Sequence, residues 1–207
     1  MRYYMFNKPR GYITACRDER QQTIMELIPE SERENLYPIG RLDKDPEGFL
    51  ILTDDGQFCY SVMNPNSNIS KTYRFWARGS LDDEKIRRLE SGVGIYNDPS
   101  IITAPARARK IGEAALRDIA ELAGEDPIKM KLTKRGDVPV TQVEMTITEG
   151  KKHQVKRMAM AVGMRVVYLE RIAIGGVSLD ADLPRGEYRA MTDSEVSKIL
   201  ESKGITD

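Results

Sequence analysis

Carboxylates cluster around one short apolar segment of this sequence and are the first candidates for chemistry. The stretch GRLDKDPEGFLILTDDG places Asp43 and Asp45 before the apolar run 49–52, with Asp54 and Asp55 directly after it. An Asp at the end of a buried strand lies on a rigid element, as a catalytic group requires. A lone Asp in a turn, however, more often accepts hydrogen bonds from the backbone of that turn. The pattern therefore leaves both roles open for Asp43, and it predicts that Asp54 or Asp55 caps the helix that follows.

A basic segment, EGKKHQVKRM, is a candidate for anion binding. Its spacing predicts a helix in which His153, Lys156 and Arg157 lie on one face, because residues three and four positions apart are neighbours on a helix. Val155 and Met158 lie on the opposite, apolar face. Cations beside a helix N-terminus suit phosphate groups, although a basic helical face is often only solvated. Both interpretations stay open for this segment.

The segment SKTYRFWARG alternates charged and aromatic residues. In a strand, Lys71, Tyr73 and Phe75 point to one face, and Arg74 and Trp76 point to the other. Such a mixture can stack a nucleic-acid base and hold its phosphates, at about 1–3 kcal/mol per stacked base. The alternative is that the aromatic side chains belong to the core. For Trp76 we favour the core, and for Tyr73 the two interpretations are balanced.

These candidates need elements to position them, and hydrophobic periodicity predicts both strands and helices. The alternation of Val143, Met145 and Ile147 with polar residues is typical of a half-buried strand. Thr192 and Glu195 form a capping box that opens a last helix. Predicted strands cover 2–9, 37–43, 48–56, 70–79, 141–150 and 164–179, and predicted helices cover 55–64, 81–92, 153–163 and 192–200. Strands and helices that do not alternate regularly indicate an α+β fold class.

Residues 105–137 do not give a single prediction. The part ARARKIGEAALRDIAELAGED, residues 106–126, is compatible with a helix. The part PIKMKLTKRGD, residues 127–137, is typical of an exposed strand and turn. The segment therefore carries no assigned element.

Composition limits the classes of protein that are possible. The chain has 207 residues, of which 40% are hydrophobic, enough for one large domain or two small lobes that share a core. The 32 Lys and Arg residues balance 32 Asp and Glu residues, so any contact with a polyanion must come from a local patch. Cys16 and Cys59 lack CxxC spacing and there is one His, which excludes a disulfide framework and a Cys/His zinc site. Without a signal peptide or an apolar run of roughly 18 residues, the sequence predicts a cytoplasmic protein with no membrane segment.

Seven sequence blocks follow one another along most of the chain. They are NKPRGY at 7–12, GRLDKDPEGFLILTDDG at 40–56, KTY at 71–73, EGKKHQVKRM at 149–158, AVG at 161–163, IGGVSLDADL at 174–183 and GEYR at 186–189. In residues and order, these blocks resemble the RsuA-type family of ribosomal RNA pseudouridine synthases. One block could match by chance, but seven in the same order make coincidence very improbable.

The resemblance implies a fold and an activity. The family's fold is a mixed, largely antiparallel sheet in two lobes flanked by helices, with the catalytic cleft between the lobes. Residues 1–207 would form a single catalytic domain without the S4 domain that begins many family members, and 105–137 would be an atypical insertion. The activity would be the isomerisation of uridine to pseudouridine, which needs neither a metal nor a cofactor.

The resemblance also assigns residues to roles. Asp43 corresponds to the essential catalytic carboxylate, Tyr73 to the residue that packs on the target uracil, and Lys156 to the cation that pairs with the carboxylate. Asp54 and Asp55 remain helix caps in this interpretation. The residues that we expect to contact RNA are Arg41, Lys8, Arg10, Lys71, His153, Gln154 and Arg157.

Several alternatives stay open. We favour small-subunit ribosomal RNA as the substrate, either as RNA or within a subunit assembly intermediate, and we expect a monomer. The alternatives within the same fold are a large-subunit enzyme and a noncatalytic RNA-binding or ribosome-assembly protein. A different class, two-carboxylate glycoside hydrolysis, would need Asp45 or Glu47 as a second acid about 5–10 Å from Asp43.

Overall fold

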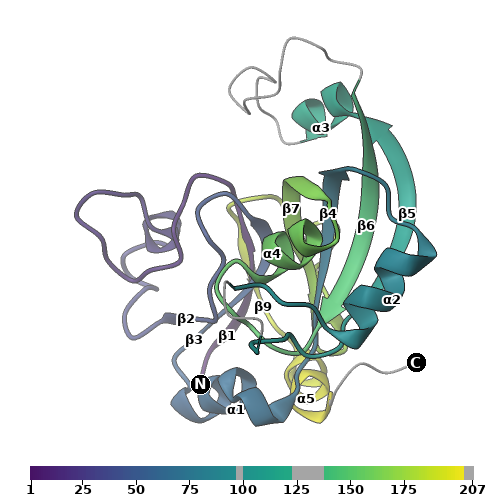
Figure 1. The fold of residues 1–207 in the computed structure, drawn as a ribbon. Helices are drawn as coiled ribbons and strands as arrows, with labels where there is room; N and C mark the ends of the chain where they lie inside the picture. The colour runs from purple at the N-terminus through teal and green to yellow at the C-terminus, as the bar shows by residue number, and fades with distance from the viewer. Residues whose placement is uncertain (97–99, 123–137, 203–207) are drawn as a thin grey trace. The chain divides into compact units, whose positions relative to one another are not determined.

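Figure 1 shows the fold as a computed structural model, which describes residues 1–96, 100–122 and 138–202. The chain forms two compact units, one made of Met1–Thr72 with Glu170–Asp207 and the other of Tyr73–Leu169. The strand and turn predicted for 127–137, and the end of the helix predicted for 106–126, lie outside the described residues. Within the described ranges, no helix is long and apolar enough to cross a membrane.

The central strand of the first unit is β3 (Glu47–Thr53). It pairs antiparallel with β1 (Tyr3–Lys8) and with β2 (Tyr37–Ile39), and β1 pairs in turn with β9 (Tyr188–Ala190). The start of β3 also pairs in parallel with Glu170 and Arg171 of β7 (Arg165–Ile174). All seven residues of β3 are buried. The run 49–52 is apolar, as is typical of a strand that is covered on both faces, while the polar residues Glu47 and Thr53 stand at its two ends.

Helices of the first unit begin at the caps that the sequence predicts. Asp55 is the N-cap of α1 (Gly56–Met63), and its carboxylate accepts hydrogen bonds from the first N–H groups of the helix. The expectation that Asp54 also caps a helix is wrong: Asp55 alone caps α1, and the carboxylate of Asp54 forms an ion pair with Arg2, with Nε and Oδ2 2.8 Å apart. The capping box of Thr192 and Glu195 opens α5 (Asp193–Glu201), which lies beside α1 (Figure 1). The short elements of this unit are η1 (Ile24–Leu27), η2 (Pro65–Ser67) and β8 (Val177–Ser178).

The second unit is also built from strands and helices. Its strands follow the order β5 (Arg107–Ala115), β6 (Pro139–Ile147), β4 (Lys71–Arg78) and β7. Its helices are α2 (Asp83–Ser91), which contacts β5, together with α3 (Leu116–Leu122) and α4 (Gln154–Ala161). Strands and helices are mixed without regular alternation in both units, so the predicted α+β class is confirmed.

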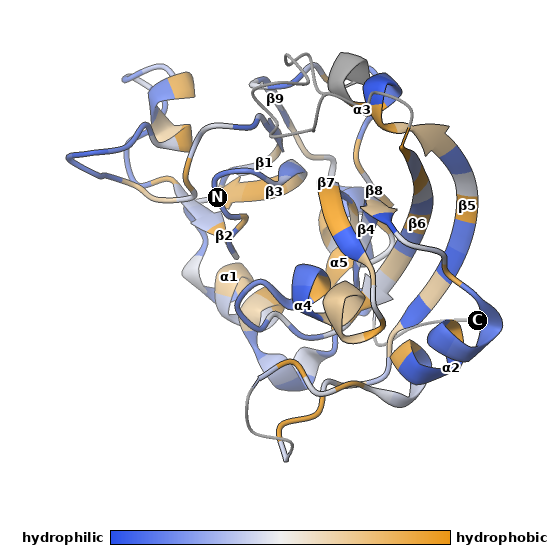
Figure 2. Cartoon of the chain, turned by 45° about the horizontal axis from the view of Figure 1, so that its top comes forward, coloured by the Kyte–Doolittle hydropathy of each residue, from blue (hydrophilic) through white to orange (hydrophobic). Residues whose placement is uncertain are grey.

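Core packing in the second unit confirms the predicted faces. Val155 and Met158 of α4 are buried in one hydrophobic cluster with Phe75. Trp76 is 3% exposed and packs edge-on against Tyr168, with ring centroids 5.2 Å apart, so its predicted place in the core is confirmed. Figure 2 shows how hydropathy differs between elements: β3 is coloured as hydrophobic and most of α2 as hydrophilic.

Residues 106–126, which the sequence leaves compatible with a helix, form a strand over their first half. Residues Arg107–Ala115 form β5, which pairs antiparallel with β6 from Arg107↔Thr146 to Ala115↔Pro139, and the register shifts between Lys110 and Gly112. Only Leu116–Leu122 is helical among the described residues of this segment. The local preference of this alanine-rich, charged sequence for a helix is outweighed by the hydrogen bonds that β6 offers along its edge.

Candidate active site

Asp43 lies in the loop that connects β2 to β3. Gly40 opens the loop with φ of 75°, a conformation that glycine adopts without steric cost. Leu42, directly before Asp43, is 5% exposed and anchors the loop in the first unit, whereas Asp43 itself is exposed. The loop therefore presents a carboxylate to solvent from a backbone that is fixed by its neighbour.

One buried hydroxyl group fixes the backbone on the N-terminal side of Asp43. The Oγ1 atom of Thr14 donates to the carbonyl oxygen of Leu42 at 2.7 Å and accepts from the N–H of Leu42 at 3.1 Å. Thr14 is 5% exposed. Both backbone groups of the residue before the carboxylate are thus satisfied by a single side chain. No sequence pattern singles out Thr14, because an isolated Thr within the loop that follows β1 carries no local signal.

Lys8 fixes the loop on the C-terminal side of Asp43. Its Nζ atom donates to the carbonyl oxygens of Pro9 at 3.0 Å, Lys44 at 3.3 Å and Pro46 at 2.9 Å. The N–H of Gly11 donates to the same carbonyl of Lys44 at 2.9 Å. Lys8 is 0% exposed, so the expected contact between Lys8 and an RNA phosphate is corrected: this ammonium group binds the loop instead.

The surroundings of Lys8 are strongly charged. Burial lowers the pKa of Lys8 to about 8, while the carboxylates of Glu47, Asp45 and Asp43 act in the opposite direction. Glu47 is itself 2% exposed and forms an ion pair with Arg185, with Nε and Oε2 2.7 Å apart. A buried, ion-paired Glu47 is poorly placed to act as the second acid of a glycoside hydrolase.

Lys71, at the start of β4, is a half-buried cation of the same unit. Burial and, to a smaller extent, the positive charge of Arg171 lower the pKa of Lys71 to about 8. Arg171 is 4% exposed, and its Nε atom donates to the carbonyl oxygen of Phe49 at 2.7 Å. An anion that approached Lys71 would therefore relieve a repulsion between two cations. Arg10 is half-buried and Arg41 is exposed, so both remain candidates for RNA contacts.

In the second unit, Tyr73 and α4 carry the remaining candidates. Tyr73 is half-buried and packs against the same hydrophobic cluster as α4. Lys156 and Arg157 are half-buried on α4, beside the buried residues Val155 and Met158. The helix therefore presents two adjacent cations from a packed backbone, as its spacing predicts.

The N-terminus of α4 has an unusual backbone. His153 is exposed and has φ of 54°, in the left-handed region, and the carbonyl of His153 accepts from the N–H of Arg157 at 3.0 Å. Gln154 is 4% exposed; its amide accepts from the N–H of Lys151 at 2.8 Å and donates to Glu149 at 2.7 Å. The expected contact between Gln154 and RNA is therefore corrected, because the amide is used inside the protein. Lys151 also pairs with Glu149.

Arg157 has an aromatic partner that is distant in the sequence. Its Cζ atom lies 4.6 Å from the centroid of the Tyr96 ring, in the geometry of a cation–π contact. Tyr96 is 38% exposed and belongs to the segment after α2. No sequence pattern joins these two residues, since neither periodicity nor a motif relates them.

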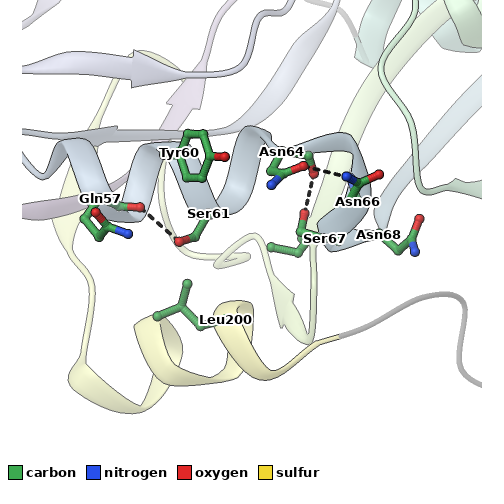
Figure 3. Close-up of a pocket in the computed structure, with 9 residues that line it drawn as sticks. Gln57, Tyr60, Ser61, Asn64, Asn66, Ser67, Asn68 and Leu200 are labelled. Carbon is green, nitrogen blue, oxygen red and sulfur yellow. Dashed lines mark hydrogen bonds between the residues drawn. The ribbon is translucent and has the colours of Figure 1, made fainter.

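The first unit also has a cavity of about 610 Å³ between α1, η2 and α5. Figure 3 shows that uncharged side chains line it, among them the amides of Gln57, Asn64 and Asn66, with Tyr60 and Leu200. The chain enters β3 from the Asp43 loop and leaves it toward α1, so this cavity lies at the other end of the strand. None of the candidate residues lines it.

Comparison with known proteins identifies the class to which this fold and these residues belong. The model of the RNA pseudouridylate synthase family matches residues 2–161. The chain belongs to this family, in its RsuA-type branch, and its enzyme class is an isomerase that acts on RNA.

Individual relatives cover nearly the whole chain. The RNA pseudouridine synthase YtzG of Bacillus subtilis is 42% identical over 96% of this chain and 73% of its own length. Ribosomal small subunit pseudouridine synthase A of Escherichia coli is 35% identical over 96% of this chain and 74% of its own length. A crystal structure of a pseudouridylate synthase has a TM-score of 0.78 at 31% identity, covering 96% of this chain and 73% of that one. Human RNA pseudouridylate synthase domain containing 1, with a TM-score of 0.54 at 13% identity over 100% of this chain and 94% of that one, shares the fold.

Proposed function

We propose that this protein converts a uridine of small-subunit ribosomal RNA into pseudouridine. The family membership supports the reaction, and the 35% identity to ribosomal small subunit pseudouridine synthase A of E. coli supports the choice of RNA. We propose further that the enzyme acts in the cytoplasm as a monomer, on ribosomal RNA or on an assembly intermediate of the subunit.

The reaction exchanges one bond for another within a single nucleotide. The bond between N1 of uracil and C1′ of the ribose breaks, and a bond between C5 and C1′ forms. C5 loses a proton and N1 gains one, so no other reactant is consumed. Asp43 acts as the nucleophile, whether it attacks the ribose or the base first. C5 displaces it from the ribose as the new bond forms, whereas an adduct with the base releases it after that bond has formed.

Two further residues have proposed roles around Asp43. Lys156 keeps the carboxylate ionised and oriented, because an opposite charge within about 4–6 Å favours the charged form. Tyr73 stacks on the uracil while the free base turns. Both assignments follow from the family motifs, and the half-buried positions of the two side chains are compatible with them.

The target nucleotide must leave the RNA stack before it can react, at a cost of a few kcal/mol. Contacts with the surrounding RNA offset this cost. We assign these contacts to Arg10, Arg41, Lys71, His153 and Arg157, each of which is half-buried or exposed.

The observation that carries the proposal is the way in which the Asp43 loop is held. Thr14 binds Leu42 before the carboxylate, and Lys8 binds Lys44 and Pro46 after it. An Asp that served only as a turn residue would not need a buried lysine and a buried threonine to fix both its flanks. A nucleophile needs this, since a displacement of about 1 Å can cost on the order of 100-fold in rate.

The test is a map of pseudouridines in ribosomal RNA from cells with and without the gene. We expect one site to disappear from small-subunit RNA and to return when the wild-type gene is restored, but not when Asp43→Asn is supplied. Loss of a large-subunit site would correct the substrate. An unchanged map would contradict the enzymatic proposal and favour a noncatalytic RNA-binding protein.

A further inference from the structure

We propose that Tyr96 holds the guanidinium of Arg157 as a binding site for one backbone phosphate of the RNA substrate. In this arrangement Arg157 touches the RNA, and Tyr96 is a positioning residue that acts through Arg157. The inference rests on the proposed function in one respect, since it takes RNA as the substrate.

The contact between the two side chains is the first observation. The Cζ atom of Arg157 lies 4.6 Å from the centroid of the Tyr96 ring. Arg157 is half-buried, and Tyr96 is 38% exposed. The ring therefore covers one part of the guanidinium, and solvent still reaches the pair. A contact of this kind restricts a long, flexible side chain to one region of space without neutralising its charge.

The second observation is that one nitrogen of the guanidinium lacks an acceptor. The Nη1 atom of Arg157 is buried and has no hydrogen-bond partner among the described residues. A buried donor without a partner destabilises the protein, and a charged donor does so more strongly. An aromatic ring does not replace an acceptor oxygen. A phosphate offers several acceptor oxygens, and its geometry matches the planar fork of N–H groups on an arginine.

The charge of the surrounding segment favours a phosphate over a neutral ligand. Lys152, His153 and Lys156 lie within five positions of Arg157 on the same segment, and each is exposed or half-buried. Glu149, the acidic residue at the start of this segment, is already engaged by Lys151 and Gln154. An anion from outside the protein therefore meets several cations at α4.

One hydrophobic cluster fixes both partners. Val93 and Ile95, next to Tyr96 in the chain, are buried in the cluster that also holds Val155 and Met158 of α4. The backbone around Val93 is further tied to Thr103: the N–H of Val93 donates to Oγ1 at 3.0 Å, and the N–H of Thr103 donates to the carbonyl of Val93 at 3.0 Å. Since one core positions the ring and the helix, the guanidinium is preorganised before RNA arrives.

The experiment compares Tyr96→Leu, Tyr96→Phe, Arg157→Met and the double variant Tyr96→Leu/Arg157→Met. A fragment of small-subunit ribosomal RNA is the probe, and its dissociation constant is measured over a range of salt concentrations. The single-turnover rate at saturating RNA is measured in parallel. Tyr60→Leu is the matched control, because Tyr60 is an exposed tyrosine, 67% exposed, that lines the uncharged cavity.

We expect Tyr96→Leu to weaken RNA binding by about 2–5-fold, with no change in the single-turnover rate. Tyr96→Phe, which keeps the ring, should bind RNA as the wild type does, and so should Tyr60→Leu. Arg157→Met should reduce the slope of log affinity against log salt by about 0.7–0.9, the value for one phosphate. The double variant should bind no more weakly than Arg157→Met, because the ring acts only through the guanidinium.

The inference is overturned if Tyr96→Leu binds RNA like the wild type, or if its effect adds fully to that of Arg157→Met. It is also overturned if Arg157→Met leaves the salt slope unchanged, because the bound group would then not be a phosphate. The binding measurements need no turnover. An absence of pseudouridine in cellular RNA would therefore count against the proposed function and leave this comparison to be judged separately.

Discussion

At the residue scale, Asp43 combines an exposed carboxylate with a fixed backbone. Its neighbour Leu42 is buried and bound at both backbone groups by Thr14, while Asp43 itself faces solvent. Asp45 lies two positions further along the same loop and is also exposed. The loop thus offers two similar carboxylates, of which only Asp43 has a proposed chemical role.

Asp43→Asn should abolish pseudouridine formation, because an amide keeps the shape of the side chain and is a poor nucleophile. Thermal stability and RNA affinity should change little, since the side chain is exposed. The measurement is pseudouridine formed in a single turnover, with thermal unfolding and RNA binding alongside. Asp45→Asn is the control and should remain active. Appreciable turnover by Asp43→Asn would remove Asp43 from the mechanism.

Lys71 should make RNA binding depend on pH. Burial and the charge of Arg171 lower the pKa of Lys71 to about 8, so this group is charged in the free protein below that pH and neutral above it. A phosphate contact favours the charged form, so RNA affinity should fall as pH rises through about 8. Lys71→Arg should bind RNA with less dependence on pH, because a guanidinium stays charged in this range. The test is to measure the dissociation constants of the wild type and Lys71→Arg between about pH 7 and 9. An equal dependence of affinity on pH in the two proteins would contradict the role of Lys71.

At the scale of elements, two threonine side chains hold β3, one near each end of the strand. Each of them forms two hydrogen bonds. Thr14 binds both backbone groups of Leu42 before the strand. After the strand, Thr53 donates to the carbonyl of Arg2 at 2.7 Å and accepts from the N–H of Asp55 at 3.0 Å. Both threonines are buried, so the two ends of one strand provide a matched comparison.

Thr14→Val should reduce the free energy of unfolding by about 1–3 kcal/mol, because it leaves a buried N–H and a buried carbonyl without a partner. It should also lower kcat more than it raises KM, since the Asp43 loop loses its fixed position. Thr53→Val should destabilise the protein to a similar extent and leave kcat close to that of the wild type. Equal kcat values for the two variants, measured well below their unfolding temperatures, would show that Thr14 has no special part in the reaction.

Substitutions of the two adjacent cations on α4 should have different effects on the reaction rate and on RNA binding. Lys156→Met removes the proposed counter-ion of Asp43, so the single-turnover rate at saturating RNA should fall strongly while affinity changes little. Arg157→Met should weaken RNA binding and leave that rate nearly unchanged. Rates and dissociation constants for both variants test this division. The assignment along α4 is wrong if the rate of Arg157→Met falls as far as that of Lys156→Met.

At the scale of the whole molecule, the balance of 32 basic and 32 acidic residues excludes a general attraction to RNA. Binding must come from a few local contacts, and four arginine or lysine residues are proposed to meet phosphates: Arg10, Arg41, Lys71 and Arg157. Many other basic residues are already paired, as Arg109 is with Glu144 at 2.8 Å.

The salt dependence of RNA binding should therefore be small. Four phosphate contacts predict a slope of about −3 for log affinity against log salt, at about 0.7 per contact on a single strand. The measurement is a salt titration of RNA binding by the inactive Asp43→Asn variant. Arg109→Ala should leave the slope unchanged. A slope near −6 would mean that basic residues outside the proposed set contact the RNA.

The sequence alone determined what depends on near neighbours in the chain. Asp55 and the Thr192–Glu195 pair cap helices as predicted, because a cap and its helix are only a few residues apart. The buried face of α4 and the alternation along β6 follow from periodicity for the same reason. The order of the seven blocks indicated the family, and with it the proposed place of Asp43 in the chemistry.

Features that depend on distant residues follow from the tertiary structure and not from the sequence pattern. The sequence predicts that Lys8 is a surface cation. In the structure its ammonium group is buried and donates to the carbonyl of Pro46, 38 positions away. Residues Arg107–Ala115 read as a helix and form a strand because β6 supplies their hydrogen bonds. Arg157 and Tyr96 meet through a shared core. In each case the residue or strand that determines the structure is distant in the sequence, so a local sequence pattern cannot predict it.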